Sequence, residues 1–205
     1  MIRNILFDFD GVILDSMKIK GDGFVELFKA YPERERNELE KYHYANGGVS
    51  RFAKIRYFFT HLIHQEISET EVECLANRFG EIIAQKLFDP ANLIPETVAF
   101  IEHHCAHYNC HIVSGAEERE LKNLCNHFKI DHYFKSIHGS PTPKPELVRA
   151  VLEHNHYHQD DTILIGDSIN DYHAAQANGI RFYGYNNGEL KPFGCYLESF
   201  NGFRP

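Results

Sequence analysis

Five short runs of apolar residues, separated by segments of helical periodicity, constrain the fold of this 205-residue chain more than any other feature. Strands buried on both faces of a parallel sheet form continuous apolar runs, and the helical segments between them fit the crossovers that parallel strands require. The sequence therefore predicts an α/β fold around a parallel sheet. The expected strands are Ile2–Phe9, His111–Val113, Ser136–His138, Thr162–Ile165 and Arg181–Tyr185. The expected helices between them are Glu96–Cys105, Glu117–His127, Glu146–His154 and Asp171–Asn178, with Gly179 ending the last.

One long segment interrupts the alternation of strands and helices. Residues 16–88 show only helical periodicity, and they are far more numerous than the roughly 2–6 residues of an ordinary strand-to-helix loop. Ser68 and Glu71 have the spacing of a capping box that opens the last helix of this segment. We therefore expect residues 16–88 to form a helical cap domain, and residues 1–15 and 89–205 to form the core, with Pro90 and Pro95 marking the return.

Composition restricts the partners and the compartment. The net charge of −8 disfavours binding to nucleic acid and to anionic membranes, and no apolar run approaches the ~20 residues of a membrane span. The amino terminus lacks the apolar stretch of a signal peptide, since Asp8 and Asp10 interrupt it. Five cysteines, an odd number at low density, indicate free thiols in a reducing compartment. These features predict a cytoplasmic protein without nucleic-acid or membrane partners, and they leave its oligomeric state open.

Polar residues follow most of the predicted strands at the point where each strand ends. Carboxyl ends of parallel strands share one edge of the sheet, where ligands of such folds bind. The residues placed there are Asp8, Asp10 and Gly11 at the end of the first strand, Ser114 and Gly115 at the end of the second, Lys144 at the start of the helix after the third, and Asp167 and Asp171 at the end of the fourth. Four crowded carboxylates would repel one another unless a cation separates them, and Mg²⁺ prefers such oxygen ligands. The sequence therefore predicts a magnesium site at this edge.

The same residues resemble the signatures of a known superfamily. Residues Asp8–Ser16 (DFDGVILDS) resemble the first signature of the haloacid dehalogenase superfamily. Ser114, Lys144 between two prolines, and Gly166–Asp171 (GDSIND) are similar to its second, third and fourth signatures, in that order. The helical segment resembles the cap of the phosphoglycolate-phosphatase-like branch. The resemblance covers essentially the whole chain and implies a Rossmann-like three-layer core with an inserted all-helical cap.

The resemblance also implies a role for each of these residues. Asp8 would be the nucleophile that forms an aspartyl-phosphate, and Asp10 would protonate the leaving oxygen and later activate water. Mg²⁺ would be held by the Asp8 and Asp167 carboxylates and the Asp10 backbone carbonyl, with Asp171 orienting a metal-bound water. The phosphate oxygens would be held by Lys144, the Ser114 hydroxyl and backbone N–H groups near Gly11 and Gly115.

The implied activity is that of a magnesium-dependent phosphatase acting on a small phosphorylated metabolite. The presence of Asp10 favours phosphate-ester substrates over those of two related branches. The dehalogenase branch has no leaving oxygen to protonate, and the phosphonatase branch lacks this second aspartate. Sugar phosphomutases of the superfamily keep this aspartate, so a phosphomutase remains an alternative, as does a non-catalytic binding protein of the same fold.

Substrate choice is expected to lie in the cap. Lys18 and Lys20 follow the hinge at residues 15–16 closely enough to face the phosphate. Asn46–Arg51 forms a glycine-containing loop at the place of the relatives' specificity loop, and Arg51, together with Lys54, would bind a carboxylate or second anionic group. A solvated basic face on a helix beginning at Ser50 is the alternative reading of Arg51 and Lys54.

Overall fold

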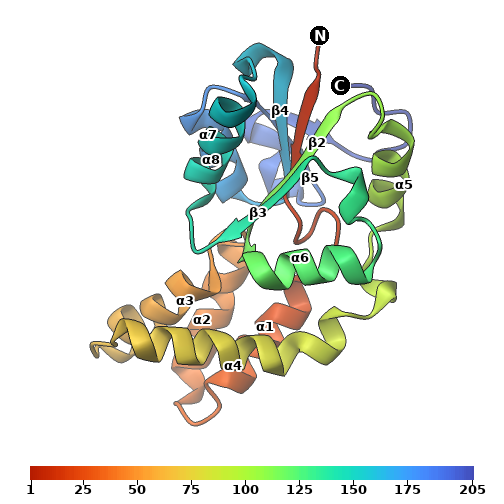
Figure 1. Cartoon of the computed structure of the whole chain (residues 1–205). Helices are drawn as coiled ribbons and strands as arrows, with labels where there is room; N and C mark the ends of the chain where they lie inside the picture. Colours follow the sequence, from red (N-terminus) through yellow and green to blue (C-terminus); the bar gives the residue numbers. More distant parts are fainter.

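The computed structural model describes all 205 residues and contains one parallel sheet of six strands (Figure 1). The strands lie in the order β3-β2-β1-β4-β5-β6, so the direction of strand progression reverses between β1 and β4, as in Rossmann-like folds. All five predicted strands are present; β6 was not predicted, because a three-residue edge strand leaves no recognisable apolar run. The bounds are β1 Asn4–Phe7, β2 Asn109–Glu117, β3 Ser136–Ser140, β4 Thr162–Gly166, β5 Arg181–Tyr185 and β6 Cys195–Leu197.

Helices cover both faces of the sheet and make the core three-layered (Figure 1). Side chains alternate between the faces of a strand. Ile5 and Phe7 of β1 accordingly pack in one apolar cluster with α5 and α6, whereas Leu6 packs in a second cluster with α7 and α8. The Rossmann-like α/β core is therefore confirmed. The helices of this part are α5 Pro95–His104, α6 Glu118–His127, α7 Lys144–Asn155 and α8 Ile169–Ala177.

Four further helices, between β1 and β2 in sequence, form a helical lobe below the carboxyl edge of the sheet (Figure 1). Ser68 and Glu71 make both bonds of the predicted capping box at the start of α4. Stacked rings join the helices, with ring centroids 4.3 Å apart for Phe24 and Phe79. The bounds are α1 Met17–Leu27, α2 Glu33–Ala45, α3 Arg51–Tyr57 with a π-helical turn at Phe58–Ile63, and α4 Glu69–Leu87.

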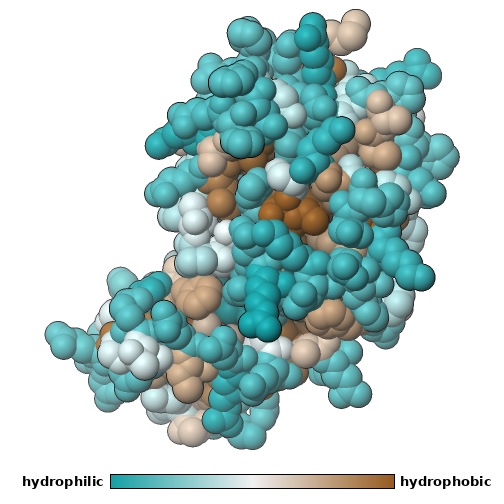
Figure 2. Space-filling view, viewed as in Figure 1, coloured by the Kyte–Doolittle hydropathy of each residue, from teal (hydrophilic) through white to brown (hydrophobic).

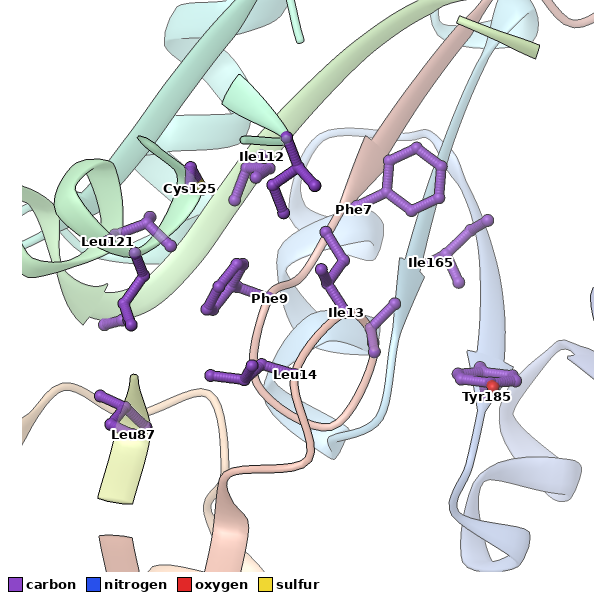
Figure 3. Packing of buried hydrophobic residues seen from close by; sticks show 14 of the residues in the cluster. Phe7, Phe9, Ile13, Leu14, Leu87, Ile112, Leu121, Cys125, Ile165 and Tyr185 are labelled. Atoms are coloured by element: carbon purple, nitrogen blue, oxygen red, sulfur yellow. The ribbon is translucent and has the colours of Figure 1, made fainter. Parts of the chain in front are cut away.

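Two chain segments that run side by side connect the helical lobe to the core. The Asp15 backbone N–H donates to the Asn92 carbonyl (2.7 Å), and the Ile94 N–H donates to the Ile13 carbonyl (2.9 Å). Beside them, the buried side chains of Leu14 and Leu87 belong to the same apolar cluster as the sheet (Figure 3). The expected domain boundaries at residues 15/16 and 88/89 lie close to these connections. One apolar cluster spans both parts, however, so the division into two domains stays a prediction.

The surface is mainly hydrophilic in the view of Figure 2, over the core and over the protruding helical lobe. The large hydrophobic side chains exposed to solvent are Met1, Tyr44 and Phe193. None of the helices has the length together with the apolar character that crossing a membrane demands.

Candidate active site

Three aspartates from two neighbouring strand ends converge at the carboxyl edge of the sheet. Asp8 directly follows β1, and its backbone N–H donates to the Ile165 carbonyl of β4 (2.9 Å). Asp167 follows β4, and Asp171 lies in the first turn of α8. One carboxylate oxygen from each of these aspartates lies within 4.8 Å of the other two. The topological switch between β1 and β4 therefore gathers the acidic residues that the sequence placed at strand ends.

Lys144, the first residue of α7, connects these carboxylates. Its buried ammonium lies 2.9 Å from Asp8 Oδ2 and also forms an ion pair with Asp171. Burial by itself lowers a lysine pKa, but the two carboxylates outweigh it, and the pKa of Lys144 is raised above its ordinary value. Asp171 is further fixed by Ser168, whose hydroxyl and backbone N–H donate to Asp171 Oδ2 at 2.6 and 3.0 Å.

The acidic cluster holds more negative charge than Lys144 balances. Burial, with the nearby Asp171 charge, raises the pKa of Asp8 to about 7. Burial and the charges of Asp8 and Asp171 raise the pKa of Asp167 well above its ordinary value. Asp167 Oδ1 is buried and has no hydrogen-bond partner. This carboxylate oxygen is buried without a partner and lies beside two further carboxylates. A hard divalent cation such as Mg²⁺ binds oxygen ligands of this kind and would neutralise their charge, so the residues present fit that ion.

The Asp10 side chain is set apart from this cluster by partners of its own. The Ser16 hydroxyl donates to Asp10 Oδ1, and the buried ammonium of Lys20 pairs with Oδ2. Burial would raise the pKa of Asp10, but the charge of Lys20 and these hydrogen bonds lower it overall. The expectation that Lys18 also faces the phosphate is wrong: its side chain is exposed and pairs with Asp22 at 3.0 Å.

Gly11 allows Asp167 to approach the loop after β1. Its φ of +73° lies in the left-handed region, and a Cβ at this position would come within 1.9 Å of Asp167 Oδ2. The loop after β5 supports both residues, since the Asn186 side chain donates to the Gly11 carbonyl (3.0 Å) and the Asn187 side chain to the Asp167 carbonyl (2.8 Å). The sequence analysis missed both asparagines, although their place after a strand end was the available signal.

The carboxyl-terminal part of β2 forms the floor of a contact with the helical lobe; the strand is longer than predicted, so Ser114 and Gly115 lie within it and not after it. Ser114 is buried, and its hydroxyl accepts a hydrogen bond from the Ala116 backbone (3.2 Å). At Gly115 the lobe comes so close that a Cβ would lie 2.3 Å from the Gly48 carbonyl oxygen. Gly48 itself leaves no room for a Cβ, which would lie 2.9 Å from the Ser168 hydroxyl oxygen. The Asn46–Arg51 loop therefore lies directly on the predicted phosphate-binding segment, and the helical lobe is closed over the core.

Arg51 and Lys54 are buried, so the alternative of a solvated basic face does not hold. The Arg51 guanidinium forms an ion pair with Glu120 of α6 and lies 5.0 Å from the centre of the Phe79 ring. The Lys54 ammonium lies 2.9 Å from His43 Nδ1. Arg51 thus connects the helical lobe to the core, and its role toward a substrate stays a prediction.

A parallel sheet with acidic residues and a buried lysine at its switch point defines an α/β enzyme fold. The chain belongs to the haloacid dehalogenase-like hydrolase family, whose model matches residues 5–185. The predicted family membership is therefore confirmed.

Curated relatives of this chain include phosphoglycolate phosphatases. The chain is 26% identical over 197 residues to phosphoglycolate phosphatase 1 of Pseudomonas aeruginosa, which covers 91% of this chain and 71% of that protein. It is 24% identical to the phosphoglycolate phosphatase of Vibrio cholerae, with coverage of 92% and 88%.

Solved structures with the same fold include a β-phosphoglucomutase from Clostridium difficile, with a TM-score of 0.79, 18% identity and coverage of 100% of this chain and 94% of that one. CbbY from Rhodobacter sphaeroides, solved in complex with phosphate, has a TM-score of 0.74 and 21% identity over 98% and 95% of the two chains. At these identities the structural likeness establishes the fold alone.

Proposed function

We propose that this hydrolase is a magnesium-dependent phosphatase that releases phosphate from a small phosphorylated metabolite through an aspartyl-phosphate on Asp8. The observation that carries the proposal is the convergence of the Asp8, Asp167 and Asp171 carboxylates beside Lys144, with Asp10 held separately by Lys20. The names of the phosphoglycolate phosphatase relatives support a phosphate ester as the substrate. The buried free thiols of Cys110 and Cys125 fit a cytoplasmic location.

The residues of the acidic cluster would hold the metal. The carboxylates of Asp8 and Asp167 and the Asp10 backbone carbonyl would bind Mg²⁺, and Asp171 would orient its water. When bound, the cation supplies the positive charge that lets a carboxylate approach an anionic phosphoryl group.

Each side chain of the site would have its own role in the proposed reaction. The Asp8 carboxylate would attack phosphorus, which splits one displacement into two easier ones. Lys144 Nζ lies 2.9 Å from Asp8 Oδ2 and would hold the nucleophile. It would also hold the phosphoryl oxygens, together with the Ser114 hydroxyl and the backbone N–H groups near Gly11 and Gly115. Asp10, outside the cluster, would give a proton to the leaving oxygen and then take one from the attacking water.

The closed helical lobe must open to admit a substrate. The cavity between lobe and core has a volume of about 20 Å³, which holds one or two water molecules and is too small for a phosphorylated acid and for a sugar phosphate alike. The names of the phosphoglycolate phosphatase relatives are the reason to rank the phosphatase above the sugar phosphomutase.

Phosphate release tests the proposal. The purified protein is incubated with phosphoglycolate, glycerol phosphate and glucose 1-phosphate, with Mg²⁺ and with a chelator. We expect release that depends on Mg²⁺ and that Asp8→Asn abolishes, whereas Asp22→Asn, at a half-buried aspartate of the helical lobe that pairs with Lys18, leaves it unchanged. Isomerisation of the sugar phosphate without release would instead establish the mutase. Binding without turnover of any compound would establish a non-catalytic binding protein.

A further inference from the structure

The small cavity between the helical lobe and the core is lined by three cationic side chains. Lys20, Arg51 and Lys54 reach it from α1 and α3, and Asp10 is the carboxylate among the lining residues. Lys20 pairs with Asp10, and Arg51 pairs with Glu120 of α6. Lys54 has no carboxylate within ion-pair distance. Two of the three positive charges are therefore compensated within the protein, and one is not.

Lys54 is held in place by a neutral histidine. Only 2% of its surface is exposed, and its Nζ lies 2.9 Å from His43 Nδ1. His43 Nε2 lies 2.9 Å from the Met17 carbonyl oxygen, which can only accept, so Nε2 carries the proton and Nδ1 accepts from Lys54. Burial and the Lys54 charge lower the pKa of His43 to about 3, which agrees with a neutral imidazole. The ammonium therefore uses one of its three donors and has two left.

A buried ammonium without a counter-ion destabilises the closed state. Ionised groups are costly to bury unless they are paired and hydrogen-bonded. Burial, with the charge of Lys20, lowers the pKa of Lys54 to about 7, which expresses the same missing negative charge. An anionic group of a ligand in this cavity would supply that charge.

We propose that Lys54, oriented by His43, binds a carboxylate of the phosphorylated substrate and thereby selects short phosphorylated carboxylic acids. The inference rests on the proposed function and names its substrate class. Arg51 is already neutralised by Glu120, which leaves Lys54 as the cation able to accept a new partner. One unpaired positive charge matches one carboxylate, whereas a second phosphate dianion would leave excess negative charge beside Asp10.

Two substrates that differ only in the carboxylate test this assignment. Phosphoglycolate and ethyl phosphate share the transferred group and differ by a carboxylate in place of a methyl group. For Lys54→Met we expect the KM for phosphoglycolate to rise about 10- to 100-fold, the range of a hydrogen bond to a charged group, with an unchanged kcat/KM for ethyl phosphate. Lys54→Arg should recover part of the affinity. Lys18→Met, an exposed lysine on the same lobe, is the matched control and should behave like the native protein.

The outcomes separate this inference from the proposed function. Equal losses on both substrates in a folded Lys54→Met variant would show that Lys54 only supports closure, and would overturn the assignment. If the native protein releases phosphate from neither compound, the proposed function fails, and calorimetric titration of phosphoglycolate then decides. Weaker binding to Lys54→Met than to Lys18→Met would support the carboxylate site, and equal binding would refute it.

Discussion

Gly11→Ala is expected to disable the site through a single added methyl group. The new Cβ would lie 1.9 Å from Asp167 Oδ2 and 2.5 Å from its Cγ, whereas ordinary contact begins at 3.4 Å. The carboxylate must therefore move by about 1.5 Å, many times the ~0.2 Å tolerance of metal–ligand distances. A non-glycine residue at φ +73° also costs about 1–2 kcal/mol of backbone strain. We expect weaker Mg²⁺ binding and a loss of phosphate release of about 10- to 100-fold, the range found when the groups that orient a metal ligand are disturbed.

Gly202→Ala separates the contact from the strain. Gly202 has a similar φ of +77° and no atom within 4 Å of its would-be Cβ. Urea unfolding should show that both variants lose stability, by at most about 2 kcal/mol from strain. Calorimetry with Mg²⁺ and a phosphate-release assay should show a defect in Gly11→Ala alone. Native Mg²⁺ affinity and turnover in Gly11→Ala would refute the role given to Asp167.

Three further perturbations test separate parts of the proposed mechanism. With enzyme in excess, Asp10→Asn should slow the first step, release of the leaving group, by about 100-fold or more for ethyl phosphate but spare it for 4-nitrophenyl phosphate, whose leaving group needs no proton. Equal losses in this first step would exclude the acid role. Glu120→Gln removes the charged partner of Arg51, so backbone hydrogen exchange in α3 should accelerate at least several-fold. Unchanged exchange would mean that this ion pair does not hold the helical lobe closed. Burial lowers the pKa of His111 to about 4, below the ordinary value of about 6.5, so the unfolded chain takes up a proton before the folded one does. The free energy of unfolding should therefore fall by about 3 kcal/mol as the pH drops from 6.5 to 4, and urea unfolding of His111→Gln should show a flatter pH dependence. The same pH dependence in His111→Gln as in the native protein would contradict this.

The sheet and its acidic edge could be predicted because their signals are local. Each buried strand forms its own apolar run, and parallel pairing alone brings the strand ends to one edge. Asp8 and Asp167 are far apart in sequence, yet their positions directly after β1 and β4 suffice to place them together. β6 gave no such signal, because it has three residues at the edge of the sheet.

The contacts between the helical lobe and the core could not be predicted, because they depend on how the two parts approach. Glu120 lies 69 residues after Arg51 and carried no mark of a cap partner. Lys18 and Lys20 were expected to act alike, but residues two positions apart point to different sides of a helix, so one is exposed and the other is buried against Asp10. The environment of Lys54 likewise required the position of His43 on another helix.

The most direct test of the proposed mechanism is to identify the residue that carries the phosphoryl group during turnover. The protein is mixed with phosphoglycolate and Mg²⁺, quenched in acid, and reduced with borohydride, which converts an aspartyl-phosphate to homoserine that peptide mapping detects. We expect homoserine at position 8, and none when substrate is omitted. Steady phosphate release with an unmodified Asp8, or with the phosphoryl group on another residue, would contradict this mechanism.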